Sequence, residues 1–142
     1  MAKAKTKKKV KKKIKVNKDQ AAERVQKIFP ILKKAYPDAT VSLDFTNPLQ
    51  LLIATILAAQ CTDARCNIVT KSLFKKNKTP GDWASAKQEQ LEDDIRSTGF
   101  YRNKSKNIKN CCQKLIDDFN GKVPDTMDEL LSLAGVGRKT AN

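Results

Sequence analysis

The chain has no histidine, and this absence limits the chemistry that its 142 residues can carry out. Without imidazole there is no Ser-His or Cys-His nucleophile pair, no histidine metal ligand and no imidazole base. Any catalysis by this chain must therefore use lysine, carboxylate or cysteine side chains.

The four cysteines do not have the spacing of a structural metal site. Cys61 and Cys66 are separated by four residues, and Cys111 and Cys112 are adjacent, whereas structural zinc sites use pairs separated by two residues. We expect reduced thiols that behave as small buried apolar residues, and no metal bound by this chain.

A glycine-containing segment near residue 142 combines a tight turn with basic side chains. Gly135, Val136 and Gly137 are followed directly by Arg138-Lys139-Thr140. Glycine permits a sharp turn and a close approach of the backbone to a ligand. The amides of such a turn, together with the positive end of the next helix, can bind a phosphate. The segment therefore predicts a helix-hairpin-helix element.

A strongly apolar segment precedes a polar turn in the middle of the sequence. Asn47 and Pro48 are typical of a helix start. The residues that follow, as far as Ala59, leave almost no polar face, so we expect this helix to lie at the centre of the domain. It is predicted to end near Gln60, and Thr62 is predicted to cap the next helix.

Three separated blocks of the sequence together resemble the endonuclease III family. They are Phe45 to Asp63, Thr98 to Lys104 and Leu133 to Asn142, and the resemblance covers residues 21–142. It implies an all-α helix-hairpin-helix DNA glycosylase fold, an incomplete six-helix barrel that ends within the second helix of the hairpin. It also implies base-excision repair, in which damaged bases, by family expectation oxidised pyrimidines, are removed and abasic sites are cleaved.

The resemblance gives Lys139 the catalytic role. In the family, the lysine after Gly-Val-Gly-Arg attacks C1′ of the damaged nucleotide, expels the base and forms a Schiff base that permits β-elimination. Adenine-specific relatives have serine there. The attack needs a neutral amine, and we expect the helix start, Arg138 and partial desolvation to lower the pKa of Lys139. The alternative is that Lys139 only binds phosphate.

Three further residues take candidate roles from the resemblance. Gln60 would fill the gap left by a flipped-out base, or it is an ordinary exposed residue at a helix end. Phe100 replaces a leucine that wedges between bases, or it belongs to the core. Asp63 lies near the base pocket, or it stabilises its helix start. The predicted DNA-binding residues are Gln60, Phe100, Gly135, Val136, Gly137, Arg138 and Thr140.

Apolar residues recur at helical spacing along most of the chain, and this pattern predicts an all-α fold. A helix is expected over residues 19–36, with Ala22, Val25, Ile28, Phe29 and Leu32 on one apolar stripe and a bend at Pro30. Further helices are expected from Thr62 to Phe74, around Trp83, through Leu91 and Ile95 to Gly99, and over residues 103–119 and 127–133.

Positive charge is concentrated in the first 18 residues, which contain ten lysines and no acidic residue. This composition predicts a disordered tail at residues 1–18 that contacts phosphates or only adds solubility. Residues 19–142 form the predicted glycosylase domain. We expect a monomer in the bacterial cytoplasm, associated with the nucleoid. Its partner would be double-stranded DNA with damaged bases or abasic sites, and no apolar run is long enough to cross a membrane.

The resemblance also indicates what these residues do not include. The family's essential aspartate and the four cysteine ligands of its 4Fe-4S cluster would lie beyond residue 142, so we expect no cofactor bound by this chain. We expect a fragment of a longer gene product, the alternative being a natural truncation. The competing function is a non-catalytic helix-hairpin-helix module, in which Arg138 and Lys139 only grip DNA phosphates.

Overall fold

The computed structural model describes residues 17–142, so that nearly all of the predicted lysine-rich tail lies outside the described residues. The chain divides into two compact units between Thr40 and Val41. Every regular element within residues 17–142 is a helix, which confirms the predicted all-α fold.

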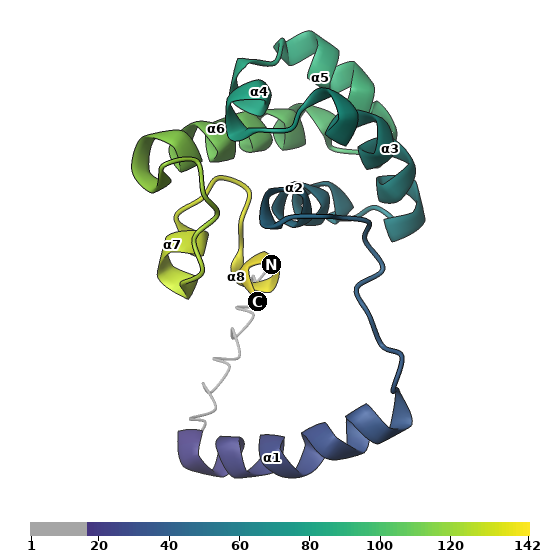
Figure 1. Ribbon diagram of the computed structural model, residues 1–142, viewed down its shortest axis with the longest axis vertical. Coiled ribbons are helices and arrows are strands. Elements are labelled where there is room, and N and C mark those ends of the chain that lie inside the picture. The colour runs from purple at the N-terminus through teal and green to yellow at the C-terminus, as the bar shows by residue number, and fades with distance from the viewer. Residues whose placement is uncertain (1–16) are drawn as a thin grey trace, which may run out of the picture. The chain divides into compact units, whose positions relative to one another are not determined.

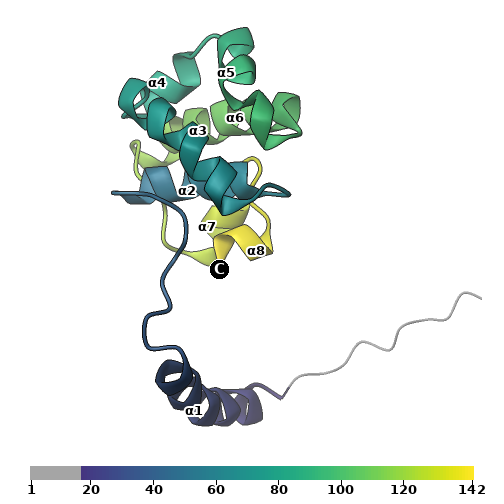
Figure 2. The same cartoon turned by 90° about the vertical axis from the view of Figure 1, so that its right-hand side faces the viewer.

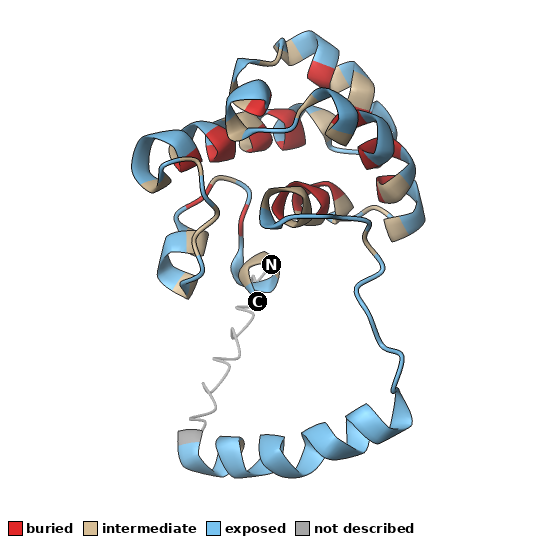
Figure 3. Cartoon of the chain, viewed as in Figure 1, coloured by how far each residue is buried: buried red, intermediate tan, exposed pale blue. Residues whose placement is uncertain are grey.

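The first unit contains helix α1 (Lys18–Ala35), within one residue of the predicted bounds. The Asn17 side chain accepts hydrogen bonds from the amides of Asp19 and Gln20, at 3.1 and 3.4 Å, and so caps its start. The helix continues through Pro30. Its apolar stripe is exposed within this unit (Figure 3), and this stripe consists of Ala22, Val25, Ile28, Phe29 and Leu32.

The second unit is built around one buried helix, α2 (Pro48–Ala58). In two perpendicular views, α2 lies between the layer of α4 to α6 and the α7–α8 hairpin (Figures 1 and 2). It contacts α3, α6 and α8. The other elements are α3 (Asp63–Lys76), α4 (Pro80–Ser85), α5 (Gln88–Ile95), the short 3-10 helix η1 (Arg96–Thr98), α6 (Tyr101–Phe119), α7 (Met127–Leu131) and α8 (Arg138–Ala141).

Helix starts follow the capping residues expected from the sequence. The Asn47 side chain accepts from the Gln50 amide at 3.0 Å, and Pro48 occupies the first turn of α2. Thr62 caps α3 through the Arg65 amide at 3.3 Å. The predicted end of α7 is two residues too late, because a tighter turn, closed by the bond from the Leu133 amide to the Leu130 carbonyl, follows Leu131. The predicted end of α6 at Phe119 is confirmed.

The core lies where α2 faces α6, which confirms the central position predicted for α2. Five residues of α2 are buried: Leu52, Ile53, Ala54, Ile56 and Leu57. On the α6 side they meet buried Ile108, Cys111, Cys112 and Leu115.

Three of the four cysteines are buried, whereas the sequence analysis predicted burial of all four. Burial raises the pKa of the Cys66 and Cys111 thiols to about 11, and that of Cys112 to about 12. Cys61 is only half-buried. The buried thiols are therefore neutral apolar groups near neutral pH.

Candidate nucleic-acid interface

Gln60 lies in the turn that follows α2, and its side chain is exposed. Its φ of 54° places this non-glycine residue in the left-handed region, which is costly and persists only where the surrounding structure imposes it. A hydrogen bond of 3.0 Å from the Cys61 amide to the Ala58 carbonyl closes the turn. The turn therefore exposes the side-chain carboxamide of Gln60 at the end of the central helix.

Phe100 begins α6 from a second left-handed position, with a φ of 48° after Gly99 at 70°. The side chain is 64% exposed, so the alternative prediction of a core phenylalanine is wrong. The Phe100 carbonyl accepts from the amides of Asn103 and Lys104 at 3.1 and 3.0 Å, the first bonds of the helix. The ring is thus an exposed apolar group on a fixed backbone.

An open hollow of about 260 Å³ brings three predicted residues together, although they are far apart in the sequence. Gln60, Phe100 and Gly135 all line it. The sequence analysis missed Asn103 and Asn107, which add carboxamides to its wall. Their spacing of four residues on α6 puts them on one helix face and is the signal that could have found them. The full lining is Ile56, Ala59, Gln60, Phe100, Asn103, Lys104, Asn107 and Gly135.

Lys104, which also lines the hollow, is a lysine with only 5% of its surface exposed. Its Nζ donates to the Leu57 carbonyl at 2.8 Å and to the Thr98 carbonyl at 2.7 Å. Burial lowers the pKa of Lys104, and the nearby thiols of Cys61 and Cys66 partly oppose this shift. No role was predicted for Lys104 itself.

The hairpin needs glycine at one of its two glycine positions. Gly135 has a φ of 79°, and a Cβ there would lie 2.9 Å from the Asn107 Cβ. Gly137 has an extended φ of −98° that any residue adopts, so the turn predicted from both glycines depends on Gly135 alone. A Cβ at Gly137 would meet open space, which leaves room for a ligand beside the backbone.

The remaining hairpin residues differ in exposure. Val136 is 7% exposed and packs in the core, so its side chain does not fit the predicted role as a DNA contact. Arg138 and Lys139 are exposed on α8, and Thr140 is half-buried. The expected partial burial of Lys139 is therefore not observed. The one-turn helix α8 contacts α2 and α7.

Asp63 is the first residue of α3 and does not line the hollow. Its carboxylate accepts a hydrogen bond from the Ser42 hydroxyl. This position suits the predicted interaction with the positive end of α3.

A helix-hairpin-helix element packed on a buried central helix defines a class of all-helical DNA repair domain. The chain belongs to the HhH-GPD superfamily of base excision DNA repair proteins, whose family model matches residues 53–141. It is 52% identical over 120 residues to the endonuclease III of a Synechocystis species, an alignment that covers 84% of this chain and 55% of that relative.

Solved structures give the same result. The chain is similar to a non-covalent endonuclease III–DNA complex and to a trapped endonuclease III–DNA covalent intermediate. Each match has a TM-score of 0.75 and 50% identity, and covers 90% of this chain and 58% of the other. The chain thus spans just over half the length of these relatives.

The described residues do not fit a metal cluster. Residues 17–142 contain no group of three or more His, Cys, Asp or Glu side chains that could hold a metal ion. No helix among these residues is long and apolar enough to span a membrane.

Proposed function

We propose that this chain carries the nucleophile and the lesion-probing residues of a bifunctional DNA glycosylase and AP lyase of the endonuclease III type. The observation that carries the proposal is the shared hollow, because Gln60, Phe100 and Gly135 come from three separate segments and meet there. Lys139 follows Gly135 by four residues. The substrate would be duplex DNA with a damaged base, by family expectation an oxidised pyrimidine, or an abasic site.

Gln60 and Phe100 would act on the DNA stack at the lesion. The exposed Phe100 ring can insert between bases and stack on them. The side-chain carboxamide of Gln60 can replace the hydrogen bonds that the partner base loses when the damaged base is flipped out. Their fixed, left-handed backbones favour this role, since strained conformations cluster at functional sites.

The hairpin would hold the DNA backbone beside the lesion. The first amides of α8 have no partner inside their own helix, as at any helix start, and can donate to a phosphate. The open space at Gly137 permits a close approach, and the exposed Arg138 adds positive charge. Thr140 completes the predicted contact set.

Lys139 would then perform the chemistry. Its neutral Nζ attacks C1′ and the bond from C1′ to the base breaks, so that the base leaves with the electron pair and takes up a proton. The C1′–O4′ bond then breaks, which opens the sugar ring and gives a Schiff base between Lys139 and C1′. Loss of a proton from C2′ expels the 3′ phosphate by β-elimination and so breaks the strand 3′ to the sugar. Hydrolysis of the Schiff base regenerates the amine. Asp63 remains a candidate base-pocket residue.

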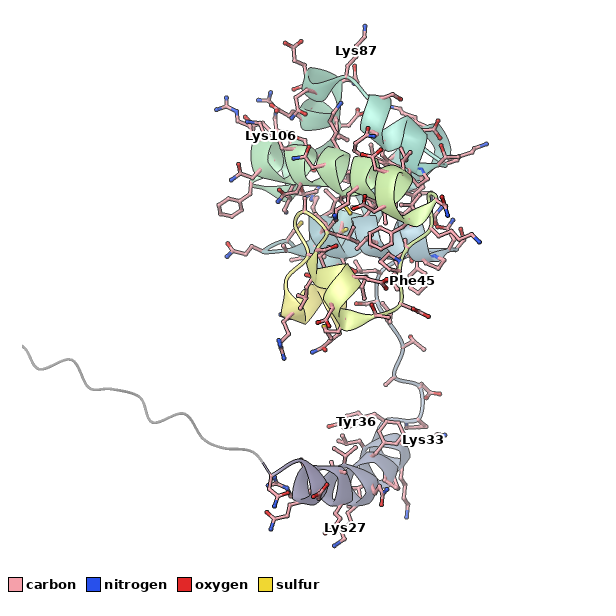
Figure 4. The ribbon with its side chains drawn as sticks, turned by 90° about the vertical axis from the view of Figure 1, so that its left-hand side faces the viewer. Lys27, Lys33, Tyr36, Phe45, Lys87 and Lys106 are labelled. Carbon is pink, nitrogen blue, oxygen red and sulfur yellow. The ribbon has the colours of Figure 1, made fainter. Side chains whose placement is uncertain are left out.

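Borohydride trapping tests this function in the complete gene product. Reduction converts the Schiff base into a stable amine that links protein and abasic-site DNA. We expect Lys139→Gln to abolish the adduct while duplex binding remains. A matched control is Lys87→Gln, because Lys87 is an exposed lysine at the start of α5 that projects from the surface (Figure 4). An adduct that persists in Lys139→Gln would mean that another amine is the nucleophile.

The second candidate function is a non-catalytic DNA-binding module, which the exposure of Lys139 and Arg138 favours. These side chains would then only neutralise phosphates. In that case the unaltered protein binds duplex DNA but gives no trapped adduct, and Lys139→Gln weakens binding.

We also propose that the complete protein acts as a monomer on DNA in the bacterial cytoplasm, at the nucleoid. The bacterial relative and the DNA complexes support this placement. A family 4Fe-4S cluster would use cysteines outside these residues, since the buried Cys66, Cys111 and Cys112 lie in the helical core.

A further inference from the structure

A single buried cation connects the two segments that present Gln60 and Phe100. Leu57, in the last turn of α2, is three residues before Gln60, and Thr98, the last residue of η1, is two residues before Phe100. The Lys104 ammonium donates to the carbonyls of both. Carbonyls at a helix end lack partners within the helix, so one side chain satisfies an end of α2 and an end of η1.

Filling the core does not explain a lysine at this position. Lys104 shares the inner face of α6 with Ile108, Cys111 and Leu115, where an apolar side chain would avoid the cost of burying a charge. Lys106, two residues along, is exposed and lies on the outside of the unit (Figure 4). What Lys104 adds to an apolar residue is the pair of directed hydrogen bonds.

We propose that Lys104 is a positioning residue, which holds the Gln60 turn and the Phe100 loop at a fixed separation so that both side chains enter DNA at one lesion. This inference rests on the proposed glycosylase function. Lys104 acts through the two neighbouring segments, and the hollow that it lines lies between them. Without the tether each left-handed residue could relax to a commoner conformation.

The test replaces Lys104 with methionine in the complete gene product. Methionine keeps an unbranched apolar stem, removes the ammonium and leaves the Leu57 and Thr98 carbonyls without this donor. Lys109→Met is a matched control. Lys109 lies on the same helix and donates to a carbonyl, that of Ala86, which belongs to neither segment. Lys104→Arg keeps a cation and tests partial rescue.

Backbone amide hydrogen exchange, measured on the protein without DNA, shows how firmly Lys104 holds the two segments. The Cys61 amide bonds to the Ala58 carbonyl at 3.0 Å, and the Gly99 amide bonds to the Arg96 carbonyl at 3.3 Å, so each reports one segment. We expect Lys104→Met to speed exchange at both amides at least about tenfold, because hydrogen bonds to a charged donor are among the stronger ones. Lys109→Met should leave both rates unchanged.

Activity then gives the functional consequence. In single-turnover assays Lys104→Met should slow base release more than trapping at a preformed abasic site, as Gln60→Ala should, with partial recovery in Lys104→Arg. Unchanged exchange at both amides, or equal losses of base release and trapping, would overturn the positioning role. Absence of any adduct in the unaltered protein would instead reject the proposed function, which the exchange experiment does not depend on.

Discussion

Two residues of the candidate site, Gln60 and Phe100, have strained backbone conformations. Each is a non-glycine residue with positive φ, a state that costs about 1–3 kcal/mol and persists only when its surroundings impose it. Lys104 donates to the carbonyl of Leu57, three residues before Gln60, and to the carbonyl of Thr98, two residues before Phe100. The strain and the buried cation are therefore two aspects of one local arrangement.

The cysteines give a test of burial at the residue scale. The thiolate is the reactive form, and burial raises the pKa of Cys66, Cys111 and Cys112 to about 11 or above, so these thiols stay protonated at pH 8. We expect iodoacetamide at that pH to alkylate the half-buried Cys61 first, and all four cysteines only after unfolding. Peptide mass spectrometry measures the order, and early alkylation of Cys112 in the folded protein would contradict the described core.

The sequence predicted several residues of the candidate site, but not the role of Lys104, the buried lysine that binds two of its segments. The family blocks identified Gln60, Phe100 and Gly135, which the structure brings to one hollow. Lys104 stood inside one of those blocks without a role, because lysine is ordinarily solvated. Its place four residues before the buried Ile108 was the available signal. The exposure of Lys139 depends on tertiary packing around α8, and the residues next to Lys139 in the sequence do not predict that packing.

At the scale of elements, helix starts that carry a capping side chain were predicted well, whereas the starts of α5 and α6, which have no such cap, were not. Starts are marked by side chains that accept from backbone amides, as Asn47, Thr62 and Thr79 do. Thr79 even forms a reciprocal capping box with Asp82, whose pKa is lowered by the backbone amides of Thr79 and Lys78. Ends are set by competition between α-helical and tighter bonds, which depends on packing rather than on one residue type.

The hairpin gives a prediction at the element scale, because its two glycines differ in what they require. Gly135→Ala introduces a Cβ 2.9 Å from Asn107 and forces a non-glycine residue to a φ of 79°. We expect it to lower the free energy of unfolding by about 1–3 kcal/mol. Gly137→Ala should change stability little, since its backbone is extended and its surroundings are open.

Urea denaturation of both variants in the complete gene product measures this difference, and duplex binding adds a second contrast. Gly137→Ala should weaken binding if the DNA backbone approaches that open face, although the fold is intact. Equal stability of the Gly135 and Gly137 variants would contradict the described turn.

At the scale of the whole molecule, hydrophobic periodicity was sufficient to predict the all-α fold class. It was not sufficient to predict which surface packs against the apolar face of each helix. The stripe on α1 was predicted from its spacing, yet its residues are exposed within their own unit. A pattern shows which side of a helix is apolar and does not identify the surface that covers it. By contrast, α2 is apolar nearly all round, and such a helix can only be central.

Charge is also distributed unevenly over the chain, and this leads to the last prediction. Ten of the 29 basic residues lie in residues 1–18 with no acidic residue, while residues 19–142 carry 19 basic and 15 acidic residues. Each phosphate that a lysine neutralises releases condensed counterions, which makes binding depend on salt without any dependence on sequence. A contacting tail would therefore contribute affinity but no preference for particular bases.

Removal of residues 1–18 from the complete gene product should weaken duplex binding and flatten its salt dependence. The slope of log affinity against log salt should fall in magnitude by about 0.9 for each phosphate that the tail no longer neutralises. Replacement of the ten lysines by glutamine keeps the length of the tail and should have the same effect, whereas a scrambled tail with the same ten lysines should bind as the unaltered protein does. Fluorescence anisotropy from low to physiological salt, on two duplexes of different sequence, measures both slope and preference. If neither deletion nor glutamine replacement changes the slope, the tail binds no phosphate and serves only solubility.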